Sequence, residues 1–183
     1  MKKFLSVTIR LLLFLIAAVI VARFYVLPQK LYPQKFSDIV AKYSSQYGVD
    51  ENMVYAIIKT ESNFNQYAVS SKNAIGLMQI TEATGEWAAA KMGINDFSKD
   101  KLFDPDINIE IGCWYIARLL KQFDSCDTAI AAYNAGSGNV SKWLENGSLS
   151  TDGTNLSAIP YSETENYVKK IKMTRQIYAY LYD

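Results

Sequence analysis

Histidine is absent from this chain of 183 residues. The absence excludes Ser-His-Asp and Cys-His catalytic groups, because both use an imidazole as the general base. It also excludes zinc sites that rely on histidine ligands. A phosphate-binding loop of the G-x-x-x-x-G-K-[ST] type is missing too. If the chain is an enzyme, carboxylates, hydroxyls and amides must perform its chemistry, and we expect no metal or cofactor.

Cysteine is scarce and the net charge is small. The two cysteines, Cys113 and Cys126, allow one disulfide, but Cys113 lies in an apolar stretch that predicts a buried helix. We therefore expect two free thiols, although an oxidising compartment would favour the disulfide. The formal charge of +1 gives no electrostatic reason to expect a nucleic-acid partner. Apolar residues make up 50% of the chain, enough for the core of one ordinary domain.

The one long apolar run lies at the N-terminus. Lys2, Lys3 and Arg10 lead into the uncharged residues 11–22. The run is long enough for a single spanning helix and lacks a small-x-small cleavage site. We therefore predict that residues 1–27 form an uncleaved transmembrane anchor, with the N-terminus in the cytoplasm and the rest of the chain outside. A cleaved signal peptide, with a secreted product, is the alternative.

The remaining chain is predicted to be one mainly α domain. Residues 28–35 include two prolines and are typical of a short extended linker. Residues 36–183 show helical patterns separated by turn signals, without internal repeats or convincing strand alternation. The fold class is therefore mainly α, with a single domain after the N-terminal helix.

Capping residues mark the expected helix ends. The first domain helix should cover residues 37–47 and end at Gly48. The expected N-caps of the next helices are Asp50, Thr81, Asp104 and Asp127. Ser162 and Glu165 fit a capping box for the last helix, which should run to about Tyr180. Gly136, Gly138 and Asn139 are expected to form a turn, and residues 146–160 a loop.

Glu61 occupies an unusual place for an acid. It follows Val54, Ile57 and Ile58 on one apolar stripe of the helix predicted from Glu51. It also lies in the last turn, where the helix dipole disfavours a carboxylate. Burial and the dipole would both raise the pKa of Glu61, as a general acid at neutral pH requires. A helix that frays before Glu61 would instead leave the side chain in water, and periodicity alone leaves this open.

Three motifs favour a functional role for Glu61 over a side chain that is simply in water. The stretches "ESNFNQYAVSSKNAIGLMQI" from Glu61, "AIAAYNAGSGNV" from Ala129 and "IPYSETENYVKKI" from Ile159 occur in this order. Together they resemble the signature of the soluble lytic transglycosylase family, which has a lysozyme-like, mostly helical catalytic domain. The resemblance implies that the chain cleaves peptidoglycan glycan strands between N-acetylmuramic acid and N-acetylglucosamine without water, giving 1,6-anhydromuramoyl ends.

The resemblance also implies roles for individual residues. Glu61 would be the catalytic acid and base, and Tyr133 would help to position it. Substrate contacts would come from Ser62, Ser70, Gly76, Leu77, Met78, Gln79, Tyr133, Asn134, Glu163 and Tyr167. Several of these also have ordinary explanations. Gly76 could simply supply a positive φ, Met78, Tyr133 and Tyr167 could pack in the core, and Glu163 could favour a helix start.

The sequence departs from the family pattern in the loop after Glu61. The family often has proline near Gln66 and Tyr67, glycine in place of Asn73, and Met-Pro in place of Thr81 and Glu82. None of these changes removes a catalytic group, so they affect the loop shape and the subsite contacts.

The sequence leaves two other functions open. A goose-type lysozyme would hydrolyse the same bond and would need a second acid, for which Glu82 and Glu86 are candidates. A non-catalytic wall-binding module would keep the fold without the reaction. In each case we expect a monomer that contacts glycan strands and the cell membrane.

Overall fold

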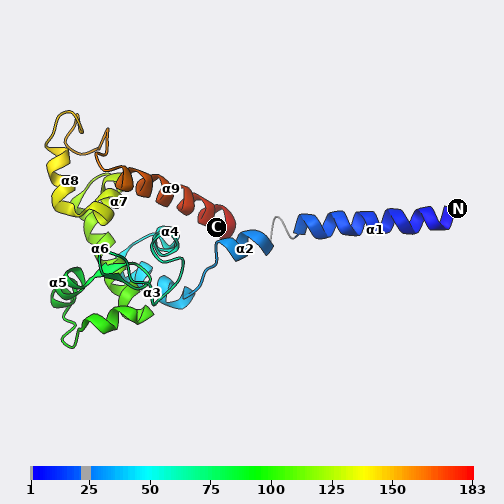
Figure 1. The fold of residues 1–183 in the computed structure, drawn as a ribbon, viewed down its shortest axis with the longest axis horizontal. Coiled ribbons are helices and arrows are strands. Elements are labelled where there is room, and N and C mark those ends of the chain that lie inside the picture. Colours follow the sequence, from blue (N-terminus) through cyan, green and yellow to red (C-terminus); the bar gives the residue numbers. More distant parts are fainter. Residues whose placement is uncertain (1, 22–25) are drawn as a thin grey trace. The chain divides into compact units, whose positions relative to one another are not determined.

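The computed structural model describes residues 2–21 and 26–183, with side chains for residues 9–21, 26 and 29–183. The chain forms two compact units, Met1–Lys35 and Phe36–Asp183. The division falls where the domain was predicted to begin. Figure 1 shows both units as ribbons.

The first unit holds α1 (Lys2–Val21) and α2 (Leu27–Leu31). Within the described residues, no helix combines the length and the apolar character needed to cross a membrane. The predicted transmembrane helix is therefore not supported. The predicted extended linker is also wrong in its first part, because α2 is helical; Pro28 is tolerated there since the first turn of a helix needs no amide donor from it.

The second unit is mainly α, as predicted. Its helices are α3 (Ser37–Tyr47), α4 (Glu51–Glu61), α5 (Glu82–Met92), α6 (Pro105–Gln122), α7 (Cys126–Ala135), α8 (Ser137–Leu144) and α9 (Ser162–Tyr182), with a short 3-10 helix, η2 (Lys99–Phe103). The long segment between α8 and α9 is irregular, as its composition predicted.

Three of the predicted N-caps form the expected hydrogen bonds. Asp50 accepts from the amide of Asn52, Thr81 from that of Thr84, and Asp104 from that of Asp106. At the other ends, Gly48 and Gly93 have positive φ angles of 67° and 77° after α3 and α5. These signals place α4 and its last residue, Glu61, where the sequence predicted.

Other end signals were wrong. Helix α7 begins at Cys126 after Ser125, so Asp127 lies inside the first turn rather than at the cap. Gly138 belongs to α8, because Gly136 alone, at φ 85°, makes the change of direction. The cap of α9 is Tyr161 and makes no side-chain hydrogen bond, so the predicted capping box from Ser162 is absent.

The described chain also contains a small sheet that the alternation pattern did not predict. Strands β1 (Ala74–Ile75) and β2 (Ile80–Thr81) pair antiparallel, with Ile75 opposite Ile80. Two residues per strand are too few to show a period of two. The turn between them, residues 76–79, carries the "GLMQ" element.

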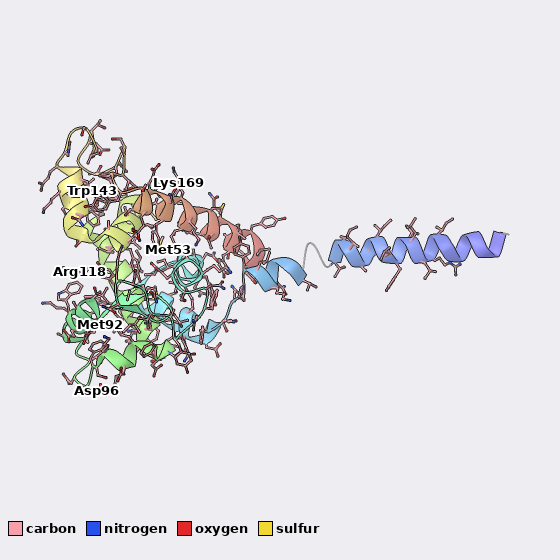
Figure 2. The ribbon with its side chains drawn as sticks, viewed as in Figure 1. Met53, Met92, Asp96, Arg118, Trp143 and Lys169 are labelled. Carbon is pink, nitrogen blue, oxygen red and sulfur yellow. The ribbon has the colours of Figure 1, made fainter. Side chains whose placement is uncertain are left out.

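Helix α4 forms the middle of the core. Its residues 52–58 are all buried, and it packs against α9 and α3 (Figure 1). Met53 is 2% exposed and lies among the side chains at the centre of this unit, whereas Asp96 and Lys169 lie at its edges (Figure 2). The ring of Tyr55 stacks on Tyr178 of α9 with centroids 5.2 Å apart.

Both cysteines are free, as predicted. Cys113 is buried within α6, and burial raises the pKa of its thiol to about 12.

Candidate active site

Glu61 is the last residue of α4 and is half-buried. The helix therefore reaches the acid and does not fray before it. The amide of Ser62 donates to the carbonyl of Ile58 at 3.1 Å and closes the helix. The Ser62 hydroxyl contacts the same carbonyl and donates to the carbonyl of Leu77 at 2.8 Å. Ser62 thus ties the end of α4 to the turn at residues 76–79.

The backbone after Glu61 is strained. Asn63 and Phe64 have φ angles of 50° and 65°, and Gln79 across the turn has 51°. Left-handed backbone costs a residue with a side chain about 1–2 kcal/mol. Non-glycine residues in this region are uncommon and concentrate at functional sites. Phe64 is held in place by burial against Tyr55.

The carboxylate of Glu61 has a partner on α9. The hydroxyl of Tyr167 donates to Oε1 of Glu61 at 2.7 Å. Tyr167 is 8% exposed, so the hydrogen bond lies at the edge of the core. It fixes one carboxylate oxygen and leaves Oε2 without a hydrogen bond from the described residues.

The environment of Glu61 raises its pKa to about 7. Removal of water from the carboxylate is the main cause. The hydrogen bond from Tyr167 and the charge of Lys170 favour the ionised form and lower the pKa, whereas the charge of Glu163 raises it. Near neutral pH the group can therefore give up a proton and take one back.

Tyr133 was expected to help position Glu61, and among the described residues its hydroxyl bonds to the turn at residues 76–79 rather than to the acid. Its hydroxyl donates to the carbonyl of Met78 at 2.8 Å. Its ring lies 5.4 Å from that of Tyr115, centroid to centroid. Burial raises the pKa of Tyr133 well above its usual value, and the charge of Glu61 adds to this, so Tyr133 is a neutral donor.

The turn at residues 76–79 is fixed by an amide that the sequence analysis missed. Asn108 of α6 is fully buried; its Nδ2 donates to the carbonyls of Ile75 and Leu102 at 2.9 and 2.7 Å. Its Oδ1 accepts from the amide of Met78 at 2.8 Å. The signal was an amide on the apolar face of α6, which must find partners when buried.

Gly76 is required by this arrangement. Its φ is 80°, and a Cβ there would lie 2.3 Å from both Asn108 Nδ2 and the Leu102 carbonyl oxygen. The Gln79 side chain donates to the carbonyls of Ala68 and Gly76, so its amide nitrogen braces the turn.

Two predicted cleft residues point into the core. Leu77 and Met78 are fully buried, and a Cβ at Gly112 would lie 2.2 Å from the Met78 sulfur. Their side chains therefore belong to the core, and only their backbone groups can serve a ligand at the turn. Ser70 also serves its own loop, because its hydroxyl accepts from the amides of Lys72 and Ala74.

The remaining predicted residues lie at the start of α9 and the end of α7. Asn134 Oδ1 accepts from the hydroxyl of Thr164 at 2.7 Å. Glu163 is exposed and pairs with Lys72 at 3.2 Å. This pair links α9 to the loop after Glu61, and it acts on Glu61 through the charge of Glu163.

Glu82 and Glu86, the candidates for a second acid, lie on α5. Glu82 pairs with Lys99 at 3.4 Å, and Glu86 is exposed. Neither is among the charges that act on the pKa of Glu61.

Comparison with known proteins shows which family this chain is similar to. The sequence model described as "Transglycosylase SLT domain" matches residues 38–152. The soluble lytic murein transglycosylase of Escherichia coli K12 is 34% identical over 152 residues, covering 81% of this chain and 24% of that protein. Membrane-bound lytic murein transglycosylase C of Edwardsiella ictaluri is 37% identical over 123 residues, covering 58% of this chain and 32% of that protein.

Solved structures agree with the sequence comparison. The 70 kDa soluble lytic transglycosylase of Escherichia coli has a TM-score of 0.73 at 30% identity, covering 84% of this chain and 25% of that one. An inactive mutant of lytic transglycosylase Slt from Pseudomonas aeruginosa gives 0.72 at 31%, covering 81% and 24%. The fold is therefore the mainly helical, lysozyme-like one. This chain spans about a quarter to a third of the length of these relatives.

Proposed function

Because this chain belongs to the transglycosylase SLT domain family, we propose that its second unit cleaves peptidoglycan glycan strands at the bond between N-acetylmuramic acid and N-acetylglucosamine. The reaction uses no water and leaves a 1,6-anhydromuramoyl end. One observation carries the proposal: Glu61 is a half-buried acid, oriented by Tyr167, with a pKa of about 7.

Glu61 acts twice in the proposed reaction. Protonated Glu61 first gives its proton to the glycosidic oxygen as the bond from that oxygen to C1 breaks, and the N-acetylglucosamine alcohol leaves. The N-acetyl carbonyl of the muramic acid residue stabilises the positive charge at C1, as in the substrate-assisted exception to the two-carboxylate rule. The C6 hydroxyl then attacks C1, and its proton returns to Glu61. The enzyme ends in its starting protonation state.

The fold supports this use of a single acid. Tyr167 holds Oε1 of Glu61, which leaves Oε2 for the sugar oxygens. The turn at residues 76–79, braced by Asn108 and Ser62, lies beside the acid and would present backbone groups to the glycan. We assign the substrate contacts to the residues that the resemblance implied, namely Ser62, Ser70, Gly76, Gln79, Tyr133, Asn134, Glu163 and Tyr167. Leu77 and Met78 would contribute backbone groups rather than side chains.

Product analysis in H₂¹⁸O tests the reaction. We expect mass spectrometry of the released muropeptides to show anhydro ends without ¹⁸O. A reducing end that carries ¹⁸O would identify a hydrolase of the goose-type lysozyme kind instead. Glu61→Gln should lower the cleavage rate at least about a hundredfold, whereas the matched control Glu86→Gln, an exposed acid, should keep it. Cleavage that survives Glu61→Gln would remove Glu61 from the mechanism.

We place this activity outside the cytoplasm, where peptidoglycan lies. Relatives from Edwardsiella ictaluri and Shigella sonnei are named membrane-bound. In α1, apolar side chains such as Leu12 and Phe14 are 57% and 75% exposed. Apolar surface of this kind favours lipid over water. We expect the chain to remain with the membrane fraction after a carbonate wash, and release by that wash would contradict this location.

A further inference from the structure

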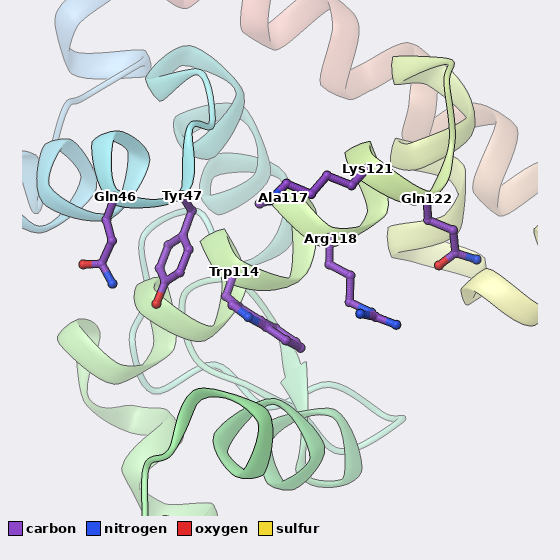
Figure 3. Close-up of a pocket in the computed structure, with 7 residues that line it drawn as sticks. All are labelled: Gln46, Tyr47, Trp114, Ala117, Arg118, Lys121 and Gln122. Carbon is purple, nitrogen blue, oxygen red and sulfur yellow. The ribbon is translucent and has the colours of Figure 1, made fainter.

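A pocket away from Glu61 lies between α3 and α6. Its volume is about 670 Å³, within the range of small-ligand sites. The lining residues are Gln46, Tyr47, Trp114, Ala117, Arg118, Lys121 and Gln122 (Figure 3). A second pocket of about 340 Å³ is lined by Asp50 and Asp127 together with their ion-pair partners Arg175 and Lys172, and by Asp183, which accepts hydrogen bonds from Asn52.

The larger pocket is positively charged on one side. Arg118 and Lys121 are exposed cations on successive turns of α6, and none of the lining residues is an acid. Among the described residues, neither cation lies within ion-pair distance of a carboxylate. Glu110, which does not line the pocket, accepts a hydrogen bond from the hydroxyl of the lining residue Tyr47 at 3.2 Å. The free positive end therefore fits an anion.

Aromatic rings form the other part of the pocket. Trp114 packs edge-on against Trp87 of α5 with centroids 5.0 Å apart. The guanidinium of Arg118 lies 5.1 Å from the Trp87 ring and is partly held there. Figure 3 shows Trp114 and Arg118 projecting from α6 on the same side. An aromatic ring beside two cations and the side-chain amides of Gln46 and Gln122 suits a sugar that carries a carboxylate.

The rings also connect the pocket with the catalytic site. Trp87 contacts Tyr115 at 6.2 Å, and Tyr115 contacts Tyr133 at 5.4 Å, centroid to centroid. Tyr133 in turn bonds to the Met78 carbonyl in the turn beside Glu61. Packed rings therefore link Trp87, which lies against Trp114 of the pocket, to the turn beside Glu61.

We propose that this pocket is a second binding site for peptidoglycan, in which Trp114 takes a sugar ring while Arg118 and Lys121 bind a carboxylate of the peptide stem. The ligand's identity rests on the proposed function. A stem-bearing strand offers both elements, and its repeating units allow the catalytic site and the pocket to be occupied together. Such double attachment would keep the enzyme on its substrate between cleavage events.

The experiment measures binding without cleavage. The full chain carrying Glu61→Gln is kept in detergent micelles and titrated with a purified disaccharide–tetrapeptide. The three tryptophan indole N–H signals are followed by NMR, and Trp114→Phe assigns one of them. We expect a saturable shift of the Trp114 signal. The double variant Arg118→Gln with Lys121→Gln should bind the disaccharide–tetrapeptide about tenfold more weakly. The disaccharide without its peptide stem should bind the unaltered pocket with a similarly reduced affinity.

The matched control removes two exposed lysines elsewhere, Lys91→Gln with Lys142→Gln, and should leave the affinity unchanged. A silent Trp114 signal, unchanged affinity after loss of Arg118 and Lys121, or equal binding of the stem-free disaccharide would each overturn the proposal. So would a shift caused by glycerol phosphate but not by the muropeptide. Cleavage by the wild-type chain is assayed separately, so failure of the proposed reaction and failure of the pocket are distinguishable.

Discussion

The hydroxyl of Tyr167 donates a 2.7 Å hydrogen bond to Oε1 of Glu61 across 106 residues of sequence. The bond joins the end of α4 to the first turns of α9, two helices that pack against each other along the core. This hydrogen bond lowers the pKa of Glu61, whereas burial of the carboxylate away from water raises it. The balance of the two effects leaves Glu61 able to change its protonation near neutral pH.

Replacing this donor should move the pH dependence of cleavage. Tyr167→Phe removes a hydrogen bond that favours the ionised carboxylate, so the pKa of Glu61 should rise above about 7. We expect the alkaline limb of the kcat/KM profile to move up by roughly one pH unit, because a hydrogen bond to a charged group contributes about 1.5–3 kcal/mol. The rate below the limb should fall as Glu61 loses its orientation.

Tyr133→Phe is the matched comparison. It also removes a part-buried hydroxyl, but one that bonds to the Met78 carbonyl rather than to Glu61. It should lower stability by about 1 kcal/mol and leave the alkaline limb in place. If both variants move the limb equally, Tyr167 has no special link to the acid.

Glu163→Gln should move the limb in the opposite direction. The negative charge of Glu163 raises the pKa of Glu61, so its removal should lower that pKa. Glu163 is exposed and paired with Lys72, which limits the movement to a few tenths of a pH unit. Titrations of activity at low ionic strength measure it best, since salt screens exposed charges. Glu165→Gln on the same helix, paired with Lys169, should cause no movement, and an equal effect there would contradict the assignment.

The ends of the main helices were predictable because single residues determine them. Asp50 and Asp104 cap their helices through a side-chain oxygen, and Gly48 supplies a positive φ, so each signal is local. The Ser162 capping box failed because the helix begins at Ser162 itself, so Tyr161 holds the cap position and makes no side-chain hydrogen bond to the first turn. The strands β1 and β2 were missed because two residues per strand are too few to show alternation.

The site was predictable only in part for a similar reason. The stripe through Val54 and Ile57 pointed Glu61 towards the core, and the structure agrees. No local pattern could decide which tyrosine reaches the acid, because that depends on how α9 crosses α4. The sequence comparison favoured Tyr133 for this position, and the hydrogen bond comes from Tyr167.

Asn108 should be among the least replaceable polar residues. Asn108→Asp keeps the acceptor for the Met78 amide but loses the donors to the Ile75 and Leu102 carbonyls and buries a charge. We expect a loss of at least about 3 kcal/mol in the free energy of unfolding, measured by urea denaturation. Asn139→Asp, at an exposed amide bonded to one carbonyl, should change it by less than about 1 kcal/mol. Comparable losses would mean that the turn does not depend on Asn108.

A pair of helical glycines tests where the Met78 side chain lies. At Gly112 a Cβ would lie 2.2 Å from the Met78 sulfur, whereas at Gly138 it would meet nothing within 4 Å. Gly112→Ala should therefore destabilise by about 1–3 kcal/mol, and Gly138→Ala should stabilise by up to about 1 kcal/mol. Thermal unfolding of both variants gives the comparison. If Gly112→Ala left the thermal stability unchanged, the Met78 side chain would be free to move away and would not be fixed in the core.

The unusual pKa of Glu61 should appear in stability as well as in activity. In the folded state the pKa is raised from 4.5 to about 7, so between these values the folded chain holds a proton that the unfolded chain has lost. Stability attributable to Glu61 is therefore complete below about pH 4.5, falls as the pH rises towards 7, and is constant above it.

Glu61→Gln removes this pH-dependent contribution to the free energy of unfolding. At pH 8 the variant should be more stable than the wild type by up to about 2–3 kcal/mol, and at pH 4 the two should be nearly equal. Urea denaturation at both pH values measures the difference, with Glu86→Gln as the exposed control that should show none. A Glu61→Gln variant less stable than the wild type at pH 8 would mean that the folded chain holds the ionised acid more favourably than water does, and that Glu61 is not kept protonated for the reaction.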